Sequence, residues 1–190
     1  MNIYLCGQKY FGAEVFKALR AAGHHLVGVS APAEDRLRAE AESCAVPWMK
    51  SGLLKADTMP PGVDLIVAAH SHDFITETTR SAAKFGAIGY HPSLLPLHRG
   101  KDALRWTIIK GDKVAGGSVY WLSDVMDGGP IAAQEHAFVL PGDTAEELWR
   151  RDLAPMGIRL LCAVCADIAS GRIVKREQNE AIATSEPTIK

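Results

Sequence analysis

The sequence predicts an α/β protein with a Rossmann-like, mostly parallel twisted sheet and helices on both faces. Two observations support this. Apolar runs such as residues 2–6 and 64–69 have no polar face, which is typical of parallel strands covered on both sides. Segments with helical periodicity lie between these runs. A length of 190 residues suits one main domain. We expect this domain over residues 1–175, followed by a polar C-terminal extension or linker over 176–190.

The first half of the chain alternates strands and helices. Apolar patterns predict strands over residues 2–6, 25–30, 64–69 and 87–90. Helical periodicity predicts helices over residues 13–22, 33–44 and 76–84. Gly23 is expected to end the first of these helices.

The pattern changes after residue 100. It predicts, in order, a helix over 102–110, two longer strands over 117–122 and 131–139, and a long helix reaching Ala169. The two strands are expected to run antiparallel to part of the sheet. Asp143 and Thr144 are suited to cap the long helix, and acidic residues fill its first turn. Residues 171–190 are polar and lack periodicity.

Charge and composition narrow the class of protein. The 21 Lys and Arg residues are scattered and the formal net charge is −1, so there is no basic patch for nucleic acid. No apolar run reaches 18 residues, and the N-terminus lacks a signal-peptide pattern. We therefore expect a cytoplasmic protein without nucleic-acid or membrane partners.

The four cysteines show no disulfide framework. Cys162 and Cys165 form a C-x-x-C pattern, but it lies inside a helix-like apolar run. Redox pairs of this spacing usually open a helix, where the helix dipole lowers the thiol pKa. Packing in a helix is therefore the expected role.

In an α/β sheet the functional loops follow the carboxyl ends of the strands. Here those loops are residues 7–12, 30–33, 70–75, 91–100 and 123–130. The first has glycine at both ends, but Lys9 replaces the middle glycine of the dinucleotide fingerprint. A nucleotide site is therefore not favoured.

Residues 89–100 carry the first candidate for chemistry. His91 follows a buried strand, and two prolines then prevent helix or ladder formation. A rigid segment that holds an imidazole at a strand end can fix a general acid or base. Spacing alone supports equally a histidine that only caps the strand.

The turn over residues 123–130 carries the second candidate. It brings Asp124 and Asp127 into a glycine-bent loop between two apolar strands. A carboxylate near an imidazole orients it and favours its protonated form. Taken alone, however, an Asp-Gly-Gly-Pro turn more often serves as a plain hairpin connection.

Taken together, these segments resemble a known family. Residues 91–96 read His-Pro-Ser-Leu-Leu-Pro, and they are followed by Arg99-Gly100, Trp106-Thr-Ile-Ile and Met126-Asp-Gly-Gly-Pro. This pattern is similar to the folate-dependent formyltransferase superfamily over roughly residues 1–185. The greatest similarity is to the hydrolase domain of 10-formyltetrahydrofolate dehydrogenase. That likeness also includes Gly7-Gln8 with Phe11-Gly12, residues 90–100, and Leu-Ala-Pro-Met-Gly-Ile at 153–158.

The resemblance implies a formyltransferase-type fold and a substrate, 10-formyltetrahydrofolate, which acts as the formyl donor. It also implies that His91 and Asp127 are the two ionisable catalytic residues. Loop 70–75 and turn 123–127 would hold the pterin, largely through backbone groups. The substrate-binding residues expected on this basis are His70, Ser71, Phe74, Ile75, Gly89, Ser123, Asp124, Val125 and Met126.

One position departs from the transferase pattern. Transferases of the superfamily read Asn-x-His, and their Asn amide helps to stabilise the oxyanion, whereas this chain has Gly89 there. Loss of one oxyanion donor costs about 3 kcal/mol, or roughly 10²- to 10³-fold in rate. The hydrolase domain also lacks Asn there, although it carries an aliphatic residue. Hydrolysis of 10-formyltetrahydrofolate is therefore the preferred hypothesis. The alternatives are N-formyl transfer to an amine acceptor and a non-catalytic folate-binding module.

Other polar residues carry weaker expectations. His70 and His72 form an H-x-H pattern, but no further ligands can be placed, so we expect loop polarity and no metal site. His98 and Arg99 could meet an anion such as the folate glutamate tail, or could lie in a solvated loop. The chain could also be part of a longer multidomain protein.

Overall fold

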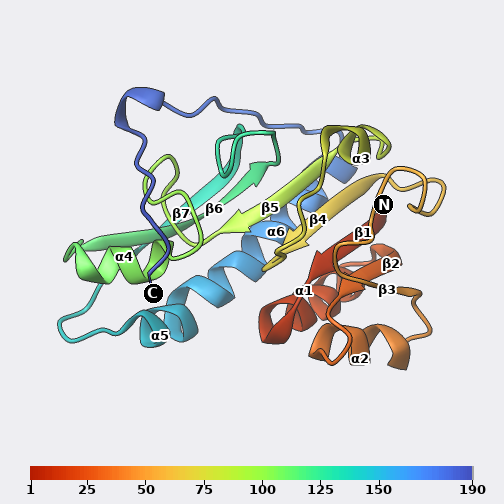
Figure 1. Ribbon diagram of the computed structural model, residues 1–190, viewed down its shortest axis with the longest axis horizontal. Helices are drawn as coiled ribbons and strands as arrows, with labels where there is room; N and C mark the ends of the chain where they lie inside the picture. Colours follow the sequence, from red (N-terminus) through yellow and green to blue (C-terminus); the bar gives the residue numbers. More distant parts are fainter. Residues whose placement is uncertain (190) are drawn as a thin grey trace. The chain divides into compact units, whose positions relative to one another are not determined.

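The computed structural model, described over residues 1–189, is an α/β fold whose strands form one seven-stranded sheet (Figure 1). The strand order is β3-β2-β1-β4-β5-β6-β7. The strands are β1 (Asn2–Gly7), β2 (His25–Ala31), β3 (Trp48–Lys50), β4 (Leu65–Ala69), β5 (Ala87–His91), β6 (Val114–Trp121) and β7 (Ile131–Phe138). Pairing is parallel from β3 to β5, whereas β7 runs antiparallel to β6. The predicted mostly parallel sheet is confirmed.

The helices follow the predicted alternation. They are α1 (Lys9–Ala21), α2 (Arg36–Ser43), α3 (Glu77–Ser81), α4 (Ala103–Ile109), α5 (Ala145–Leu148) and α6 (Ala154–Ala169). A π-helical turn, η1 (Trp149–Leu153), joins α5 to α6, and a 3₁₀ turn, η2 (Glu180–Ile182), lies near the C-terminus. None of the helices in residues 1–189 is long and apolar enough to cross a membrane.

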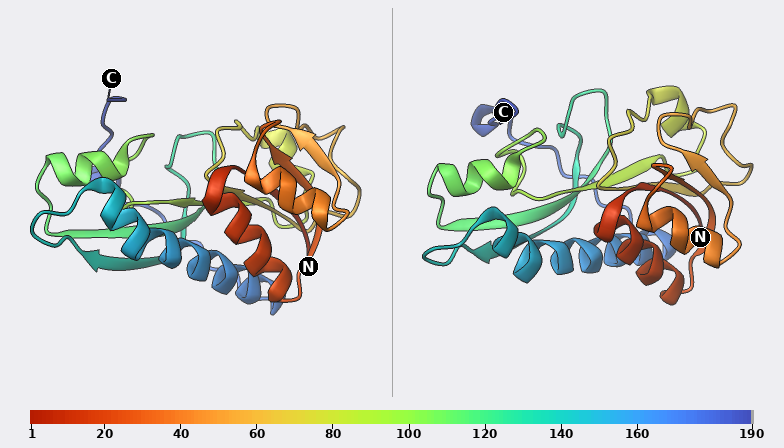
Figure 2. Two further views of the ribbon diagram at one scale, coloured as in Figure 1. Left: turned by 90° about the horizontal axis from the view of Figure 1, so that it is seen from below. Right: turned by 60° about the horizontal axis from the view of Figure 1, so that its bottom comes forward.

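The chain divides into two compact units, Met1–Gly89 and Tyr90–Lys190. In the first unit, α1 and α2 lie side by side and pack against the β1–β2 region (Figure 2). On these strands, residues such as Leu5 and Val29 are fully excluded from solvent. This unit supplies the loop over residues 70–75, which follows β4.

The first helix begins earlier than the sequence predicted. Residues 9–12 belong to α1, so the segment between β1 and the helix is not an extended glycine-rich loop. The two glycines allow this close approach. A Cβ on Gly7 would lie 2.6 Å from the Ala69 carbonyl oxygen, and one on Gly12 would lie 3.3 Å from the Gly7 backbone. These glycines therefore serve strand and helix packing.

Strand β3 was missed by the sequence analysis. It has three residues, too few to show a period of two, and it pairs with the edge of β2. The Trp48 indole Nε1 donates a hydrogen bond of 3.1 Å to the Ala31 carbonyl oxygen, which helps to fix the pairing.

In the second unit, α6 packs along β6 and β7 (Figure 2). The predicted long helix is continuous through Ala169, and Thr144 caps it in a capping box with Glu147. The π turn inside it was not predicted. Pro155 lacks an N–H and cannot make the regular helical hydrogen bond, which accounts for a change of register just before it. Leu148, Leu153 and Met156 still reach one buried cluster with Ala115.

Burial of the cysteines agrees with a packing role for the C-x-x-C pattern. Burial raises the pKa of Cys165 to about 12 and also raises that of the half-buried Cys162.

We expect iodoacetamide at pH 8 to label neither Cys165 nor the fully buried Cys6 within the time that labels Cys44. Peptide mass spectrometry of the native protein measures this order, and rapid labelling of Cys165 would contradict it.

Candidate active site

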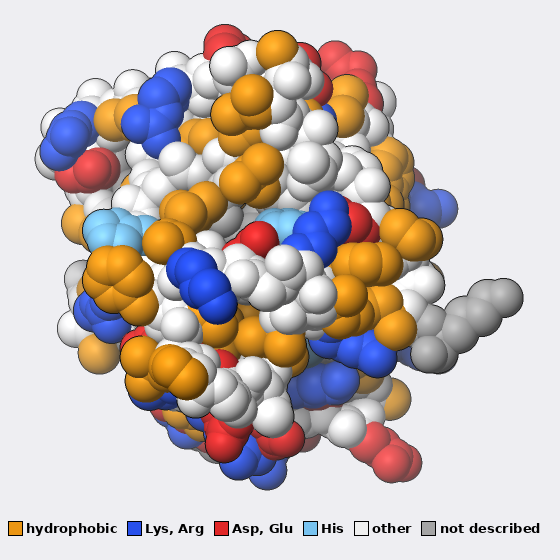
Figure 3. All heavy atoms as spheres, turned by 90° about the vertical axis from the view of Figure 1, so that its left-hand side faces the viewer, with side chains coloured by type: hydrophobic (Ala, Val, Ile, Leu, Met, Phe, Trp, Pro, Cys, Tyr) orange, Lys and Arg blue, Asp and Glu red, His pale blue; other side chains and the backbone are white. Residues whose placement is uncertain are grey.

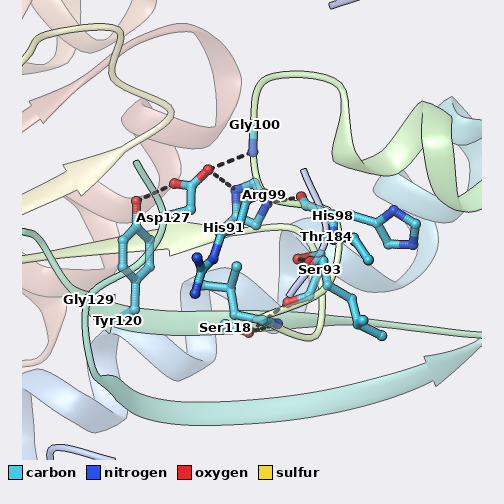
Figure 4. Close-up of polar contacts among 12 residues, drawn as sticks. His91, Ser93, His98, Arg99, Gly100, Ser118, Tyr120, Asp127, Gly129 and Thr184 are labelled. Atoms are coloured by element: carbon cyan, nitrogen blue, oxygen red, sulfur yellow. Dashed lines mark hydrogen bonds and ion pairs between the residues drawn. The ribbon is translucent and has the colours of Figure 1, made fainter. Parts of the chain in front are cut away.

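The candidate site of the second unit is built where β5 and β6 end. His91 is the last residue of β5, and Asp127 lies in the connection between β6 and β7 (Figure 4). The His91 Nδ1 atom faces Asp127 Oδ2 at 3.6 Å, and both side chains are largely buried. The structure therefore brings together the two residues that the sequence analysis proposed as a pair.

The His91 ring is fixed from its other side. Its Nε2 lies 2.7 Å from the His98 backbone oxygen, so Nε2 carries a hydrogen that it donates to this carbonyl. Nδ1 is consequently the position at which the ring gains or loses a proton. The 3.6 Å separation from Asp127 Oδ2 is longer than an N–H···O hydrogen bond, so the two atoms face each other without being hydrogen-bonded to each other.

Asp127 is held on both carboxylate oxygens (Figure 4). Oδ2 accepts a hydrogen bond of 2.8 Å from the Gly100 backbone N–H, and Oδ1 accepts one of 2.6 Å from the Tyr120 hydroxyl. Burial and the Asp127 charge raise the pKa of Tyr120 well above its usual value, so this hydroxyl remains a donor. The site therefore presents an oriented carboxylate to the imidazole.

The local backbone explains the Asp-Gly-Gly pattern. Asp127 has φ = 52°, in the left-handed region that aspartate tolerates better than most residues. A Cβ on Gly129 would lie 1.8 Å from the Trp121 carbonyl oxygen, so no larger residue fits there. The turn is thus a hairpin connection that also aims the carboxylate at His91.

The segment between His91 and His98 is held by side chains of β6 and β7. The Ser118 hydroxyl donates to the Ser93 carbonyl at 2.6 Å and accepts from the Leu95 N–H at 3.0 Å. Gln134 of β7 adds a hydrogen bond of 2.8 Å to the Leu95 carbonyl. These contacts fix the carbonyl that orients His91.

The solvated-loop interpretation of His98 and Arg99 was wrong. The two side chains are buried, and carboxylates of the same chain pair with them. The alternative, contact with an anionic group of the substrate, stays a prediction. His98 Nε2 lies 2.7 Å from Asp112 Oδ2, while Arg99 contacts Glu180 at 2.6 Å. The sequence could not show this because the partners are distant along the chain.

The C-terminal segment is a further part of the site that the sequence analysis missed. The Gln178 amide donates hydrogen bonds of 2.7 Å to the carbonyls of Asp127 and Gly129, and its oxygen accepts from Arg99. Thr184 Oγ1 accepts from the His98 N–H at 2.8 Å. The polar C-terminal segment therefore packs against the segment that follows His91 and against the turn that holds Asp127. The domain boundary at residue 175 remains a prediction.

We expect Gln178→Ala to lower the free energy of unfolding by about 2 kcal/mol, because it leaves two buried carbonyls without a donor. This corresponds to a decrease in Tm of roughly 4–8 °C for a chain of this size. Glu177→Ala, at an exposed neighbouring position, serves as the control. Equal melting temperatures for the two variants would show that the tail does not stabilise the turn.

The remaining predicted substrate-binding residues of the second unit lie in the turn before Asp127. Val125 and Met126 are 60% and 67% exposed, and Asp124 is also exposed. Ser123 is engaged within the turn, since its hydroxyl accepts from the Val125 N–H at 3.2 Å. The turn thus presents two apolar side chains next to Asp127, a surface suited to a flat ring.

The other predicted residues lie in the first unit. Gly89 is buried on β5 and pairs with Ala68 of β4, the strand that leads into loop 70–75. Phe74 is 73% exposed, whereas Ile75 is buried. Desolvation, together with the nearby Lys9 charge, lowers the pKa of His70, whose ring stacks edge-on with His72. Ser71 accepts from the Asp73 N–H at 3.1 Å.

In residues 1–189, no three His, Cys, Asp or Glu side chains gather as metal ligands would. The face drawn in Figure 3 intersperses acidic and basic side chains. A hollow of about 370 Å³ beside β7 and α6 is lined by residues such as Phe138, Arg151 and Met156, and includes neither His91 nor Asp127.

An α/β sheet with a facing histidine and aspartate at its strand ends is typical of an enzyme. Comparison with known proteins identifies the family. The formyl transferase family model matches residues 2–164, so the chain belongs to the formyl transferase family. It is 38% identical over 98% of its length to cytosolic 10-formyltetrahydrofolate dehydrogenase of Homo sapiens. The chain spans only 22% of that relative's length.

Solved structures share the fold. Glycinamide ribonucleotide transformylase 1 from Symbiobacterium toebii matches with a TM-score of 0.80 and 24% identity, over 94% of this chain and 93% of that one. An N-formyltransferase from Helicobacter canadensis, in complex with folinic acid and dTDP-3-aminofucose, also has a TM-score of 0.80, with 14% identity. That match covers 98% of this chain and 70% of the other.

Proposed function

We propose that this chain hydrolyses 10-formyltetrahydrofolate to tetrahydrofolate and formate, with His91 and Asp127 as its catalytic residues. The observation that carries the proposal is the facing pair itself, in which His91 Nδ1 and Asp127 Oδ2 stand 3.6 Å apart. Each of the two side chains is also held in place by hydrogen bonds to other groups. Such a pair can transfer protons to and from the atoms bonded to a carbonyl carbon.

The substrate is inferred from family membership and from the relatives. The 38% identity to a protein named as a 10-formyltetrahydrofolate dehydrogenase supports a formylated folate. The exposed Val125 and Met126 beside Asp127 support contact with an apolar ring system. We propose the turn over residues 123–127 as part of the pterin site, and loop 70–75 with Gly89 as further substrate-binding residues.

The proposed reaction begins when water adds to the formyl carbon. Asp127 takes the proton that this water loses, and protonated His91 donates a hydrogen bond from Nδ1 to the developing oxyanion. The C–N10 bond then breaks as His91 passes its proton to N10, and the proton held by Asp127 returns to His91. Formic acid leaves and ionises, which releases one proton to solvent.

The absence of Asn at Gly89 supports hydrolysis over transfer, because the hydrolase domain that the sequence resembles also lacks Asn there. Gly89 lies on β5 two residues before His91. Glycine cannot supply a side-chain amide, so the oxyanion has one donor fewer, which costs about 3 kcal/mol in either reaction. We propose that the protonated His91 carries more of this stabilisation.

The proposal is tested by incubating the protein with 10-formyltetrahydrofolate alone and measuring formate and tetrahydrofolate. We expect equal amounts of both without any amine present. Formate release no faster than the uncatalysed rate, with formyl transfer when an amine such as a nucleotide-linked amino sugar is added, would show a transferase. Tight folate binding without turnover under either condition would show a binding module.

A further inference from the structure

Tyr120 contacts the candidate carboxylate in a way that neither the sequence pattern nor the family match assigns. It lies near the end of β6, and its hydroxyl donates a hydrogen bond of 2.6 Å to Asp127 Oδ1. The other oxygen, Oδ2, accepts from the Gly100 N–H and faces His91 (Figure 4). The hydroxyl therefore acts on the oxygen that points away from the imidazole.

We propose that Tyr120 is a positioning residue, which holds the plane of the Asp127 carboxylate toward His91. This inference rests on the proposed function, because it assigns Tyr120 a role through Asp127. Tyr120 itself is not proposed to touch the substrate.

Packing fixes the direction of the hydroxyl. The Tyr120 ring is 8% exposed and packs with Leu95 and Ile131 in a buried cluster. Ring packing would be the same for phenylalanine, so the hydrogen bond is a separate property of the hydroxyl. Because burial and the Asp127 charge raise the pKa of Tyr120 well above its usual value, the donor persists at any pH at which the protein would work.

The Tyr120 hydroxyl is a neutral donor among charged and titratable groups. In the second unit, the titratable groups in contact with Asp127 are His91 from β5 and Tyr120 from β6. The Arg99 guanidinium, from the segment after β5, is bonded to Gln178 and Glu180. The Tyr120 hydroxyl is therefore a neutral donor on the carboxylate oxygen that faces away from the imidazole, and a hydrogen bond to a carboxylate is stronger than one between neutral groups.

Tyr120→Phe removes the hydroxyl and keeps the ring. We expect kcat for formate release to fall about tenfold while KM changes less than twofold. Loss of one of its donors lets the carboxylate plane turn away from His91, so the loss should appear in kcat and not in substrate binding. Tyr120→3-fluorotyrosine, which keeps the donor, should retain the wild-type kcat.

Tyr4→Phe is the matched control, because Tyr4 is also buried but its hydroxyl contacts a neutral group, Ser30 Oγ, at 3.2 Å. We expect its kcat for formate release to equal that of the wild type. ¹³C NMR of the aspartate carboxyl groups, with Asp127 assigned through Asp127→Asn, gives a second measurement that needs no turnover. In Tyr120→Phe the Asp127 carboxyl resonance should move from its wild-type position because Oδ1 has lost a hydrogen-bond donor, whereas in Tyr4→Phe it should stay in place.

The two proposals fail differently. If the wild type releases no formate, the proposed function is wrong, and the NMR comparison still decides whether Tyr120 holds Asp127. If the wild type is active but Tyr120→Phe has the same kcat and the same Asp127 resonance, Tyr120 is only a core residue and the inference is overturned.

Discussion

Replacing His91 by alanine is expected to reduce formate release about a thousandfold, the largest effect of any single substitution considered. General acid–base catalysis by a positioned side chain typically contributes 10²- to 10⁴-fold. In the proposed reaction His91 both stabilises the oxyanion and protonates N10, and alanine can do neither. The rate of formate release at saturating 10-formyltetrahydrofolate measures the effect.

The control for His91→Ala is His136→Ala, which removes an exposed imidazole from β7. Its turnover should equal that of the wild type. Folate binding by His91→Ala, measured by calorimetry, should change little, because the ring is assigned to the chemical step. Normal turnover by a folded His91→Ala protein that binds folate would remove His91 from the mechanism.

Asp127→Asn is expected to lower kcat by roughly a hundredfold to a thousandfold. The amide keeps the size of the side chain but loses the charge that stabilises protonated His91. The Asn NH₂ group is a donor, so one of the two present donors, the Tyr120 hydroxyl or the Gly100 N–H, loses its acceptor. Steady-state kinetics of formate release, with separate kcat and KM, measures the loss.

Asp167→Asn provides the comparison for a surface carboxylate, since Asp167 is exposed and pairs only loosely with Arg172 at 3.5 Å. It should leave kcat unchanged. If Asp127→Asn and Asp167→Asn behaved alike, the carboxylate near His91 would have no part in the reaction.

The fold was largely predictable from the sequence because its signals are local. Apolar runs with no polar face marked the parallel strands, and Thr144 with Glu147 marked the start of the last long helix. Errors arose where a short element depends on its neighbours. Strand β3 has only three residues, and α1 starts at Lys9 because Gly7 and Gly12 permit close packing.

The candidate site was predictable only in its two ionisable groups. His91 and Asp127 were singled out by the family that the segments over residues 90–130 resemble, since spacing alone left each of them open to a structural role. The groups that orient them gave no sequence signal. The His98 carbonyl and the Gly100 N–H are backbone atoms, and Gln178 lies 51 residues beyond Asp127. Tyr120 looked like any apolar strand residue until its hydroxyl could be placed.

The most direct test of the central claim is hydrolysis of 10-formyltetrahydrofolate in H₂¹⁸O, with the protein and this folate alone. The account predicts one ¹⁸O atom in each formate and one tetrahydrofolate per formate, at a rate that His91→Ala abolishes. Unchanged 10-formyltetrahydrofolate after incubation with the folded wild-type protein would contradict it.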